Sequence, residues 1–366
     1  MILYVLDQNF RTVEVIDSLI SLIWTDKYDE AGEVEVETSA IGRYWDAFQP
    51  NYYLWLKESE HLMIIEDREI TTDYEKGITI KVTGRSLESI LERRIVWGQT
   101  IFKDKSIKDI ISDLLNQSII SPSDSQRKIP NFILGDFQNG SEGAMMTKVD
   151  AQYTGDDLYT VIKTLCQACG IGFSIILNDQ NQFVFNLYEG EDHTYNQFKN
   201  PYIVFSPTQN NITSTDYLDS EKTKRTVALV LGEGEGAERK AWTTQADSEN
   251  APVGLLRREL YVDARDISTQ TEEGEEISED EYNQMLDTRG KEKLAENIAT
   301  TAFDGQVDAL VTYEYKKDYF LGDIVQVVNE LGMELNLRVK EYIYSQDVNG
   351  ITYYPSFATY DGSKTI

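Results

Sequence analysis

The only two cysteines of the chain, Cys166 and Cys169, have the Cys-x-x-Cys spacing that redox and zinc sites use. A structural zinc site needs four ligands, and the sequence offers no second cysteine pair and only two histidines. Both cysteines also belong to the amphipathic segment 158–169, where a helix would place them on one buried face. We therefore expect two small core side chains rather than a metal or redox site.

The two histidines, His61 and His193, are the side chains best suited to general-base chemistry near neutral pH. His61 opens the apolar segment 62–65, where a ring packed at the end of a strand is expected. His193 lies in the polar sequence Glu-Asp-His-Thr and is expected to be a surface loop residue. Neither a Gly-x-Ser-x-Gly nor a His-Glu-x-x-His motif occurs, and carboxylates are too abundant for a glycosidase pair to stand out. The sequence thus predicts no catalytic, cofactor-binding or metal-binding residue.

A glycine-rich segment and an acidic run are two further candidates for chemistry. Residues 232–236 alternate glycine and glutamate, but they lack the Lys-Ser/Thr of a phosphate loop, and their two glutamates would repel phosphate. We interpret them as an exposed turn between strands. The acidic run over 272–281 is expected to be a solvated loop that leads into a helix over 279–302, whose acidic first turn complements the helix dipole.

The net charge of −29 over 366 residues limits the classes of partner. Phosphate backbones attract lysine and arginine, so this chain is not expected to bind nucleic acid sequence-specifically. An acidic surface favours solubility, and it would also let nucleic acid pass without sticking. No stretch approaches the roughly 20 apolar residues of a membrane span, and the start lacks the features of a signal peptide, so folding in a cytoplasm is expected.

The first hundred residues are expected to form antiparallel β-structure. Residues 33–38 alternate strictly between glutamate and valine or threonine, which is typical of a strand with one buried and one solvated face. Turns about every ten residues indicate a small barrel or sandwich. Further strands are predicted over residues 2–6, 12–16, 21–24, 52–57, 61–71 and 77–84.

The middle of the chain has helical periodicity. Ser86 and Ser106 are predicted to cap helices over 87–94 and 107–115, and a third helix over 156–168 is predicted to end at Gly170. The rest of this part is expected to be a hairpin of strands 172–177 and 182–188, with long loops over 121–150.

The last part returns to β-structure. The Gly322-Asp323 turn is expected to be structural, with glycine for backbone geometry and aspartate for a local hydrogen bond. Strands are predicted within 201–232 and over 256–262, 307–315, 324–328, 337–346 and 350–357. The order β, α/β, β predicts a mainly β protein of the α+β class.

Two stretches built from turn glycines and strand patterns carry a family resemblance. They are residues 22–37 with 84–88 and 91–94 after them, and residues 319–327 with 337–341 and 350–353 after them. Together they resemble the phage tail hub proteins of the siphovirus Gp37-like group, related to the N-terminal region of tail-associated lysins, the prophage endopeptidase tail proteins. The similarity spans nearly the whole chain.

The resemblance implies a baseplate-hub-like architecture of two small β-barrels that flank α/β elements. The N-terminal barrel would comprise residues 1–100, completed by strands in 201–232, and residues 101–200 would form the α/β module. Residues 201–300 would supply β-strands and a long helix that link the parts, and residues 301–366 would supply the strands of the C-terminal barrel.

The resemblance also implies partners and a place in the virion. The chain would form a homotrimer at the tail tip, dock to a hexamer of the distal tail protein and surround the channel that holds DNA and the tape measure protein. A downstream tail lysin or receptor-binding protein would be a further partner, and no cofactor is implied. Two alternatives remain open from the sequence: a tail-associated peptidoglycan endopeptidase, and a receptor-binding module whose tyrosines stack on carbohydrate.

Overall fold

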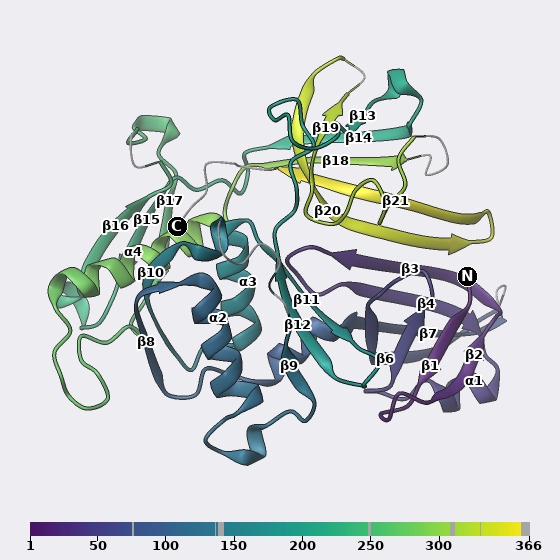
Figure 1. Ribbon diagram of the computed structural model, residues 1–366, viewed down its shortest axis with the longest axis horizontal. Coiled ribbons are helices and arrows are strands. Elements are labelled where there is room, and N and C mark those ends of the chain that lie inside the picture. Colours follow the sequence, from purple (N-terminus) through teal and green to yellow (C-terminus); the bar gives the residue numbers. More distant parts are fainter. Residues whose placement is uncertain are drawn as a thin grey trace.

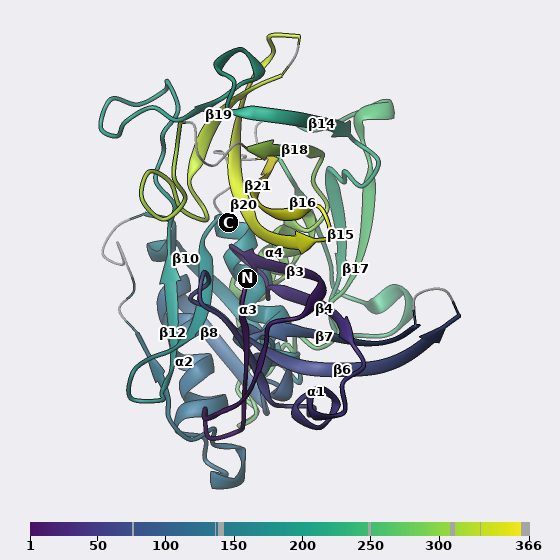
Figure 2. The same ribbon diagram turned by 90° about the vertical axis from the view of Figure 1, so that its right-hand side faces the viewer.

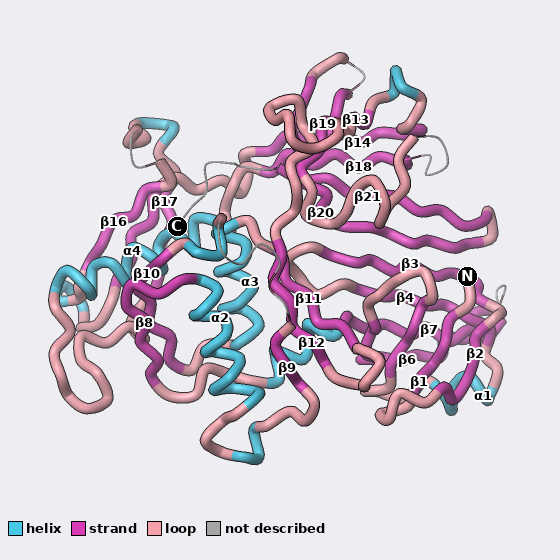
Figure 3. Tube along the Cα trace, viewed as in Figure 1, coloured by secondary structure: helices cyan, strands magenta, loops and turns pink. Residues whose placement is uncertain are grey.

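The computed structural model describes residues 1–74, 77–135, 137, 143–247, 250–307, 312–329 and 331–359. Strands dominate one half of the molecule, and helices gather in the other half (Figure 3). In the described residues, no helix is both long enough and apolar enough to cross a membrane.

Seven strands and a short helix form the N-terminal part, at the right of Figure 1. The alternating sequence of β4 (Glu33–Ser39) gives one buried and one solvated face, as predicted, because Val34 and Val36 are buried whereas Glu33 and Glu35 are exposed. The strands are hydrogen-bonded in the order β3-β4-β7-β6-β5-β1-β2. The elements are β1 (Leu3–Leu6), β2 (Thr12–Ile16), β3 (Leu19–Lys27), β4 (Glu33–Ser39), α1 (Gly42–Ala47), β5 (Tyr53–Leu56), β6 (Leu62–Asp73) and β7 (Gly77–Ser86).

Six more strands continue the same sheet on the C-terminal side. They are β13 (Val204–Phe205), β14 (Ile212–Ser220), β18 (Thr300–Val307), β19 (Ile324–Val328), β20 (Glu334–Asp347) and β21 (Gly350–Thr359). The strand β20 pairs with β3 from Glu341 opposite Lys27 to Gln346 opposite Leu22. Figure 2 shows β20 and β21 lying directly above β3 and β4.

This pairing corrects two sequence predictions. In the described part of the chain, the two β parts form one open thirteen-stranded sheet with a shared core, rather than two closed barrels. The strands expected to complete the N-terminal barrel do not do so, since β13 pairs with β19 and β14 pairs with β18. The edge of β3 that does not pair with β4 is occupied by β20. The mainly β, α+β class is confirmed.

The α/β module packs beside this sheet around a second apolar core. Its helix α2 begins as predicted, with the Ser106 hydroxyl accepting the Asp109 N–H, and α3 ends at Gly170 in the left-handed region (φ 69°). The predicted loops over 121–150 contain two strands, β9 and part of β10; residues 136 and 138–142 lie outside the described residues. The elements are η1 (Leu87–Arg93), β8 (Gln99–Ser106), α2 (Ile107–Leu115), η2 (Asn116–Ile120), η3 (Ser125–Arg127), β9 (Phe132–Leu134), η4 (Ala144–Met146), β10 (Lys148–Thr154), α3 (Leu158–Cys169), β11 (Gly172–Leu177) and β12 (Phe183–Tyr188).

A small sheet and the longest helix occupy the far end of the molecule. Helix α4 lies between this sheet and β10. The helix begins at the predicted residue but ends at Ala295, where Asn297 caps it by donating to the Lys293 carbonyl, and the following residues pair with β14 as β18. The predicted strand over 307–315 is therefore misplaced, and residues 308–311 lie outside the described residues. The elements are β15 (Val227–Leu231), η6 (Gly236–Glu238), β16 (Ala241–Gln245), η7 (Gly254–Leu256), β17 (Glu259–Asp263) and α4 (Glu279–Ala295), whereas η5 (Pro207–Gln209) lies between β13 and β14.

Candidate functional site: two charged cavities where the parts of the chain meet

Tyr28, in the turn between β3 and β4, joins three parts of the chain. Its side chain is fully buried, and its hydroxyl donates to the carbonyl oxygen of Gly170 at the end of α3, at 3.1 Å. Its ring meets Tyr188 of β12 edge to face, with 5.3 Å between centroids, and the Arg338 guanidinium of β20 lies 4.9 Å above the ring. One aromatic side chain thus fixes the sheet, the α/β module and β20 relative to one another.

Two glycines make room for this ring. A Cβ atom at Gly322 would lie 2.2 Å from the Tyr28 ring, and one at Gly172 would lie 2.3 Å from it. Gly322 also has a φ of +92°, a backbone conformation that other residues rarely adopt. The next residue, Asp323, accepts the backbone N–H groups of Glu191 and Phe320 at 2.7 and 2.8 Å. These contacts confirm the structural role predicted for the Gly322-Asp323 turn.

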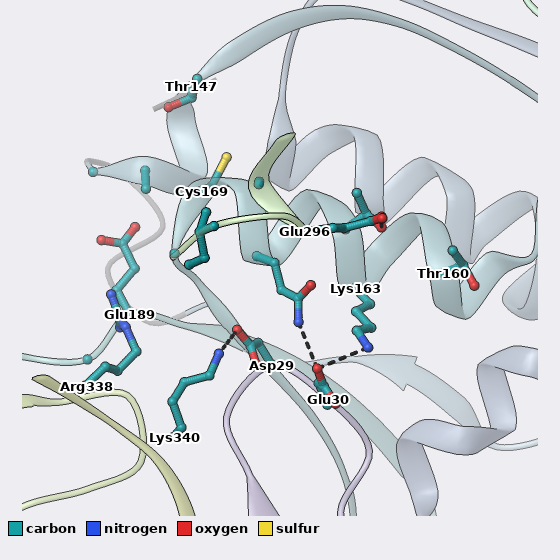
Figure 4. A pocket seen from close by; sticks show the side chains of 18 of the residues that line it. Asp29, Glu30, Thr147, Thr160, Lys163, Cys169, Glu189, Glu296, Arg338 and Lys340 are labelled. Atoms are coloured by element: carbon teal, nitrogen blue, oxygen red, sulfur yellow. Dashed lines mark hydrogen bonds and ion pairs between the residues drawn. The ribbon is translucent and has the colours of Figure 1, made fainter. Parts of the chain in front are cut away.

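Gly170 and Arg338, which both contact Tyr28, also line a cavity of about 860 Å³ (Figure 4). The next two residues of the turn hold its walls together: Asp29 pairs with Lys340 of β20, and Glu30 pairs with Lys163 of α3 at 3.0 Å. Four carboxylates and four cations line the cavity, so their charges balance and no ligand charge is favoured. They are Asp29, Glu30, Glu189, Glu296, Lys163, Lys293, Arg338 and Lys340.

A second cavity of about 820 Å³ shares residues 189–190 with the first and contains both histidines of the chain. His61 lies just before β6, at a strand end as predicted, with its Nδ1 3.5 Å from Oε1 of the buried Glu88. Burial opposes a charged ring, but Asp26 and Glu88 outweigh this effect and raise the pKa of His61 to about 9. Burial likewise opposes ionisation of Glu88, yet its bonds with His61 and Ser86 lower the pKa of this carboxyl.

His193 is not the surface residue that the sequence predicted. Only 6% of it is exposed, its Nδ1 lies 2.8 Å from the Pro201 carbonyl oxygen, and its Nε2 lies 3.4 Å from Asp323 Oδ2. Burial works against the charged ring, whereas the bonds to Asp323 and Pro201 raise the pKa of His193. The ring therefore ties the loop after β12 to the turn before β19.

The order of these groups decides what chemistry they can do. The Ser86 hydroxyl donates to Glu88, and Glu88 pairs with His61, so the carboxylate lies between the hydroxyl and the imidazole. A nucleophilic triad needs the imidazole between them, next to the hydroxyl. Both nitrogens of His193 have partners as well. Among the described residues, no three His, Cys, Asp or Glu side chains gather as metal ligands.

The remaining candidates from the sequence lie apart from this chemistry. Cys166 and Cys169 are buried on α3, as predicted, and burial raises the pKa of Cys166. Residues 232–236 form the predicted turn between β15 and β16, and Glu233 accepts both the N–H and the hydroxyl of Thr269 at 2.7 Å.

Sequence reasoning missed the buried carboxylates of this region. Asp26 is 1% exposed and accepts the Trp24 indole N–H at 2.9 Å together with the Ser59 hydroxyl. Glu88 is also 1% exposed and accepts the Ile175 N–H at 2.7 Å. The one available signal was that Glu88 lies in an apolar stretch, after Leu87 and before the pair Ile90-Leu91. The Ser86 cap predicted for this segment is wrong, because the Ser86 hydroxyl accepts the Gly32 N–H instead.

Solved structures of three tail proteins are among those that share the fold of the chain. They are prophage tail protein gp18 from Listeria monocytogenes EGD-e (12% identity, TM-score 0.51, 99% of this chain and 95% of that chain), the 43 kDa tail protein of prophage MuSo2 from Shewanella oneidensis (12%, 0.55, 98% and 98%) and the tail protein from Neisseria meningitidis MC58 (13%, 0.56, 99% and 97%). Comparison with curated protein sequences gives no match. The family described as Siphovirus ReqiPepy6 Gp37-like protein matches residues 2–357, so the chain belongs to this family.

Proposed function

We propose that this chain is a structural, non-catalytic hub at the distal tip of a phage tail, assembled as a homotrimer that closes the tail tube. Membership of the Gp37-like family and the fold shared with prophage tail proteins support a structural role in a tail. The ion pairs around Tyr28 and the two histidines connect segments of the chain, which is the task of a scaffold.

One observation carries the proposal. Each chain places two β parts side by side and joins them through the pairing of β3 with β20. Three copies therefore bring six β parts, and a ring of three can match a ring of six above it. In the described sheet, the strand path ends at β2 and β14. End strands carry unpaired N–H and C=O groups, which suits association with neighbouring copies.

The proposed partners follow from this position. A hexamer of the distal tail protein would sit on one face of the ring, with the tape measure protein in its channel, and a tail lysin or receptor-binding protein would bind on the opposite face. The chain would assemble in the host cytoplasm and remain in the virion. With a net charge of −29, a carboxylate-lined channel would repel DNA and let it slide through.

Native mass spectrometry of the chain with the distal tail protein of the same phage tests the proposal. We expect a complex of three copies of this chain with six of the partner. A ratio of one to one, or no complex, contradicts the symmetry match. A peptidoglycan zymogram of the purified chain should show no clearing, and clearing would instead support the endopeptidase alternative.

A further inference from the structure

A projecting loop at one end of the molecule exposes three apolar side chains. Val253, Leu255 and Leu256 lie in the loop between β16 and β17 and are 73%, 98% and 72% exposed. Figure 1 shows this loop extending beyond its three-stranded sheet, at the upper left. Neighbouring apolar side chains exposed at the tip of a loop suit contact with another surface better than contact with water.

Arg257 and Arg258 follow these side chains in the sequence, and contacts within the fold bring the basic segment 221–226 next to this part of the loop. The Thr226 N–H donates to the Arg258 carbonyl at 2.8 Å, its hydroxyl donates to the Leu256 carbonyl at 3.1 Å, and Arg258 pairs with Glu221 at 3.0 Å. Segments 221–226 and 253–259 together carry five cations against the carboxylates of Glu221 and Glu259. Asp247 follows Ala246, whose N–H donates to the Thr226 carbonyl, so the local surplus is two positive charges. We call the three apolar side chains and the five cations the basic tip: Val253, Leu255, Leu256, Lys222, Lys224, Arg225, Arg257 and Arg258.

The β6–β7 hairpin at the other end of the longest axis has the opposite character (Figure 1). The strand β5 pairs with β6 only as far as Ile64, so one edge of β6 is unpaired over its outer half. On the other side of the hairpin, β4 pairs with β7 only from Thr79 onward. The projecting part exposes Ile70 (46%), Tyr74 (104%) and Ile78 (53%).

Carboxylates dominate this part of the hairpin. Asp67, Glu69 and Asp73 are exposed, whereas the one arginine between them, Arg68, donates to the carbonyl oxygens of Trp45 and Phe48 at 2.8 and 3.0 Å. Along β6, Ile70 lies on one face and Glu69 and Asp73 lie on the other. A partner that binds around the free edge of β6 therefore contacts apolar side chains on one face and acidic side chains on the other. We call the apolar and acidic side chains together the acidic hairpin end: Asp67, Glu69, Ile70, Asp73, Tyr74 and Ile78.

We propose that the basic tip of one copy docks on the acidic hairpin end of a second copy. This inference rests on the proposed ring and names the surfaces that form it. A chain with a net charge of −29 repels its own copies, so a local positive surface is where two copies can approach. The two surfaces differ and lie at opposite ends of the molecule, so their contact is head-to-tail, and such contacts close into a ring when the rotation between copies allows it.

Three variants of the full chain test the docking. The tip variant carries Leu255→Glu and Leu256→Glu, and the hairpin variant carries Ile70→Lys and Ile78→Lys. The control, Val348→Glu, changes a side chain that is 88% exposed in the turn between β20 and β21. Unchanged circular dichroism spectra and a single cooperative unfolding transition establish that each variant folds.

Light scattering over a concentration series then gives the mass of each species. We expect the wild type and the control to be trimers, and the tip and hairpin variants to associate at least about tenfold more weakly, which corresponds to about 1.4 kcal/mol. An equimolar mixture of the tip and hairpin variants should give a 1:1 heterodimer, because together they retain one intact pair of surfaces.

Three outcomes overturn the inference. If both variants remain trimers like the wild type, the surfaces are wrong while the threefold hub stands. If the wild type is a monomer throughout, the self-docking and the free trimer both fail. A basic tip with exposed leucines also suits an anionic membrane. In a flotation assay with phosphatidylglycerol vesicles, the wild type and the hairpin variant could bind the vesicles while the tip variant does not. If all three proteins also remained trimers, the tip would be assigned to a membrane instead.

Discussion

Replacing Glu88 by glutamine should leave the largely buried His61 ring without its nearest counter-charge. The pKa of His61 rises from 6.5 to about 9 on folding, and each pKa unit corresponds to about 1.4 kcal/mol, so ionisation of the ring contributes about 3 kcal/mol to stability. Because Asp26 shares in raising this pKa, Glu88→Gln should lose about 2 kcal/mol of that amount. The lowered pKa of Glu88 arises from the same ion pair, so its free energy is not counted in addition to that of His61.

The sign of the pH dependence follows from the raised pKa. The contribution of His61 is complete below its unfolded pKa of 6.5 and is lost as the pH rises through about 9. The wild type should therefore lose about 3 kcal/mol of unfolding free energy between pH 6 and pH 10, and Glu88→Gln should lose less than about half of that.

Urea unfolding followed by tryptophan fluorescence at pH 6 and pH 10 measures both effects. With an m value of about 3 kcal/mol/M, the variant's midpoint at pH 6 should fall by about 0.7 M. The control is Glu92→Gln, which breaks a half-exposed pair with Arg85 and should cost at most about 1 kcal/mol. Equal pH dependence in the wild type and Glu88→Gln would refute the account of the buried pair.

Three further predictions concern the junction, helix α4 and the thiols. Gly322→Ala should destabilise the chain by about 2 to 5 kcal/mol, measured by calorimetry, because its Cβ would meet the Tyr28 ring at a positive φ; an unchanged melting temperature would contradict this. Tyr153→Phe removes a 2.6 Å hydrogen bond that Tyr153 of β10 donates to the buried Glu292 of α4, and it should lower the free energy of unfolding in urea by about 2 kcal/mol. A loss near zero would show that this bond does not hold α4 against β10. Both cysteine thiols should react with Ellman's reagent only after unfolding, since both are buried and the pKa of Cys166 is raised; rapid reaction of the native chain would count against a core role.

Local signals in the sequence predicted the elements well. The alternation around Val34 and Val36 predicted β4, the apolar period of residues 107–115 predicted α2, and Gly170 marked the end of α3. Each of these signals acts over a few residues, through the pleat of a strand or the turn of a helix. The order of β, α/β and β parts followed from them.

Long-range pairing was not predictable in the same way. Nothing near β3 indicates that its free edge pairs with β20, more than three hundred residues later in the chain, and so the two β parts were expected to close separately. His193 lies in a polar segment, and its burial depends on contacts with Pro201 and with Asp323, which is 130 residues away. The helix predicted to run on to residue 302 ends early because residues 300–307 gain strand partners on β14.

The mass of the purified full chain, measured by light scattering across a concentration series, tests the central claim most directly. The account predicts a stable species of three times the chain mass, since three copies supply the six β parts of the proposed ring. A chain that stays monomeric at every concentration, and also when the distal tail protein is added, would contradict the threefold hub.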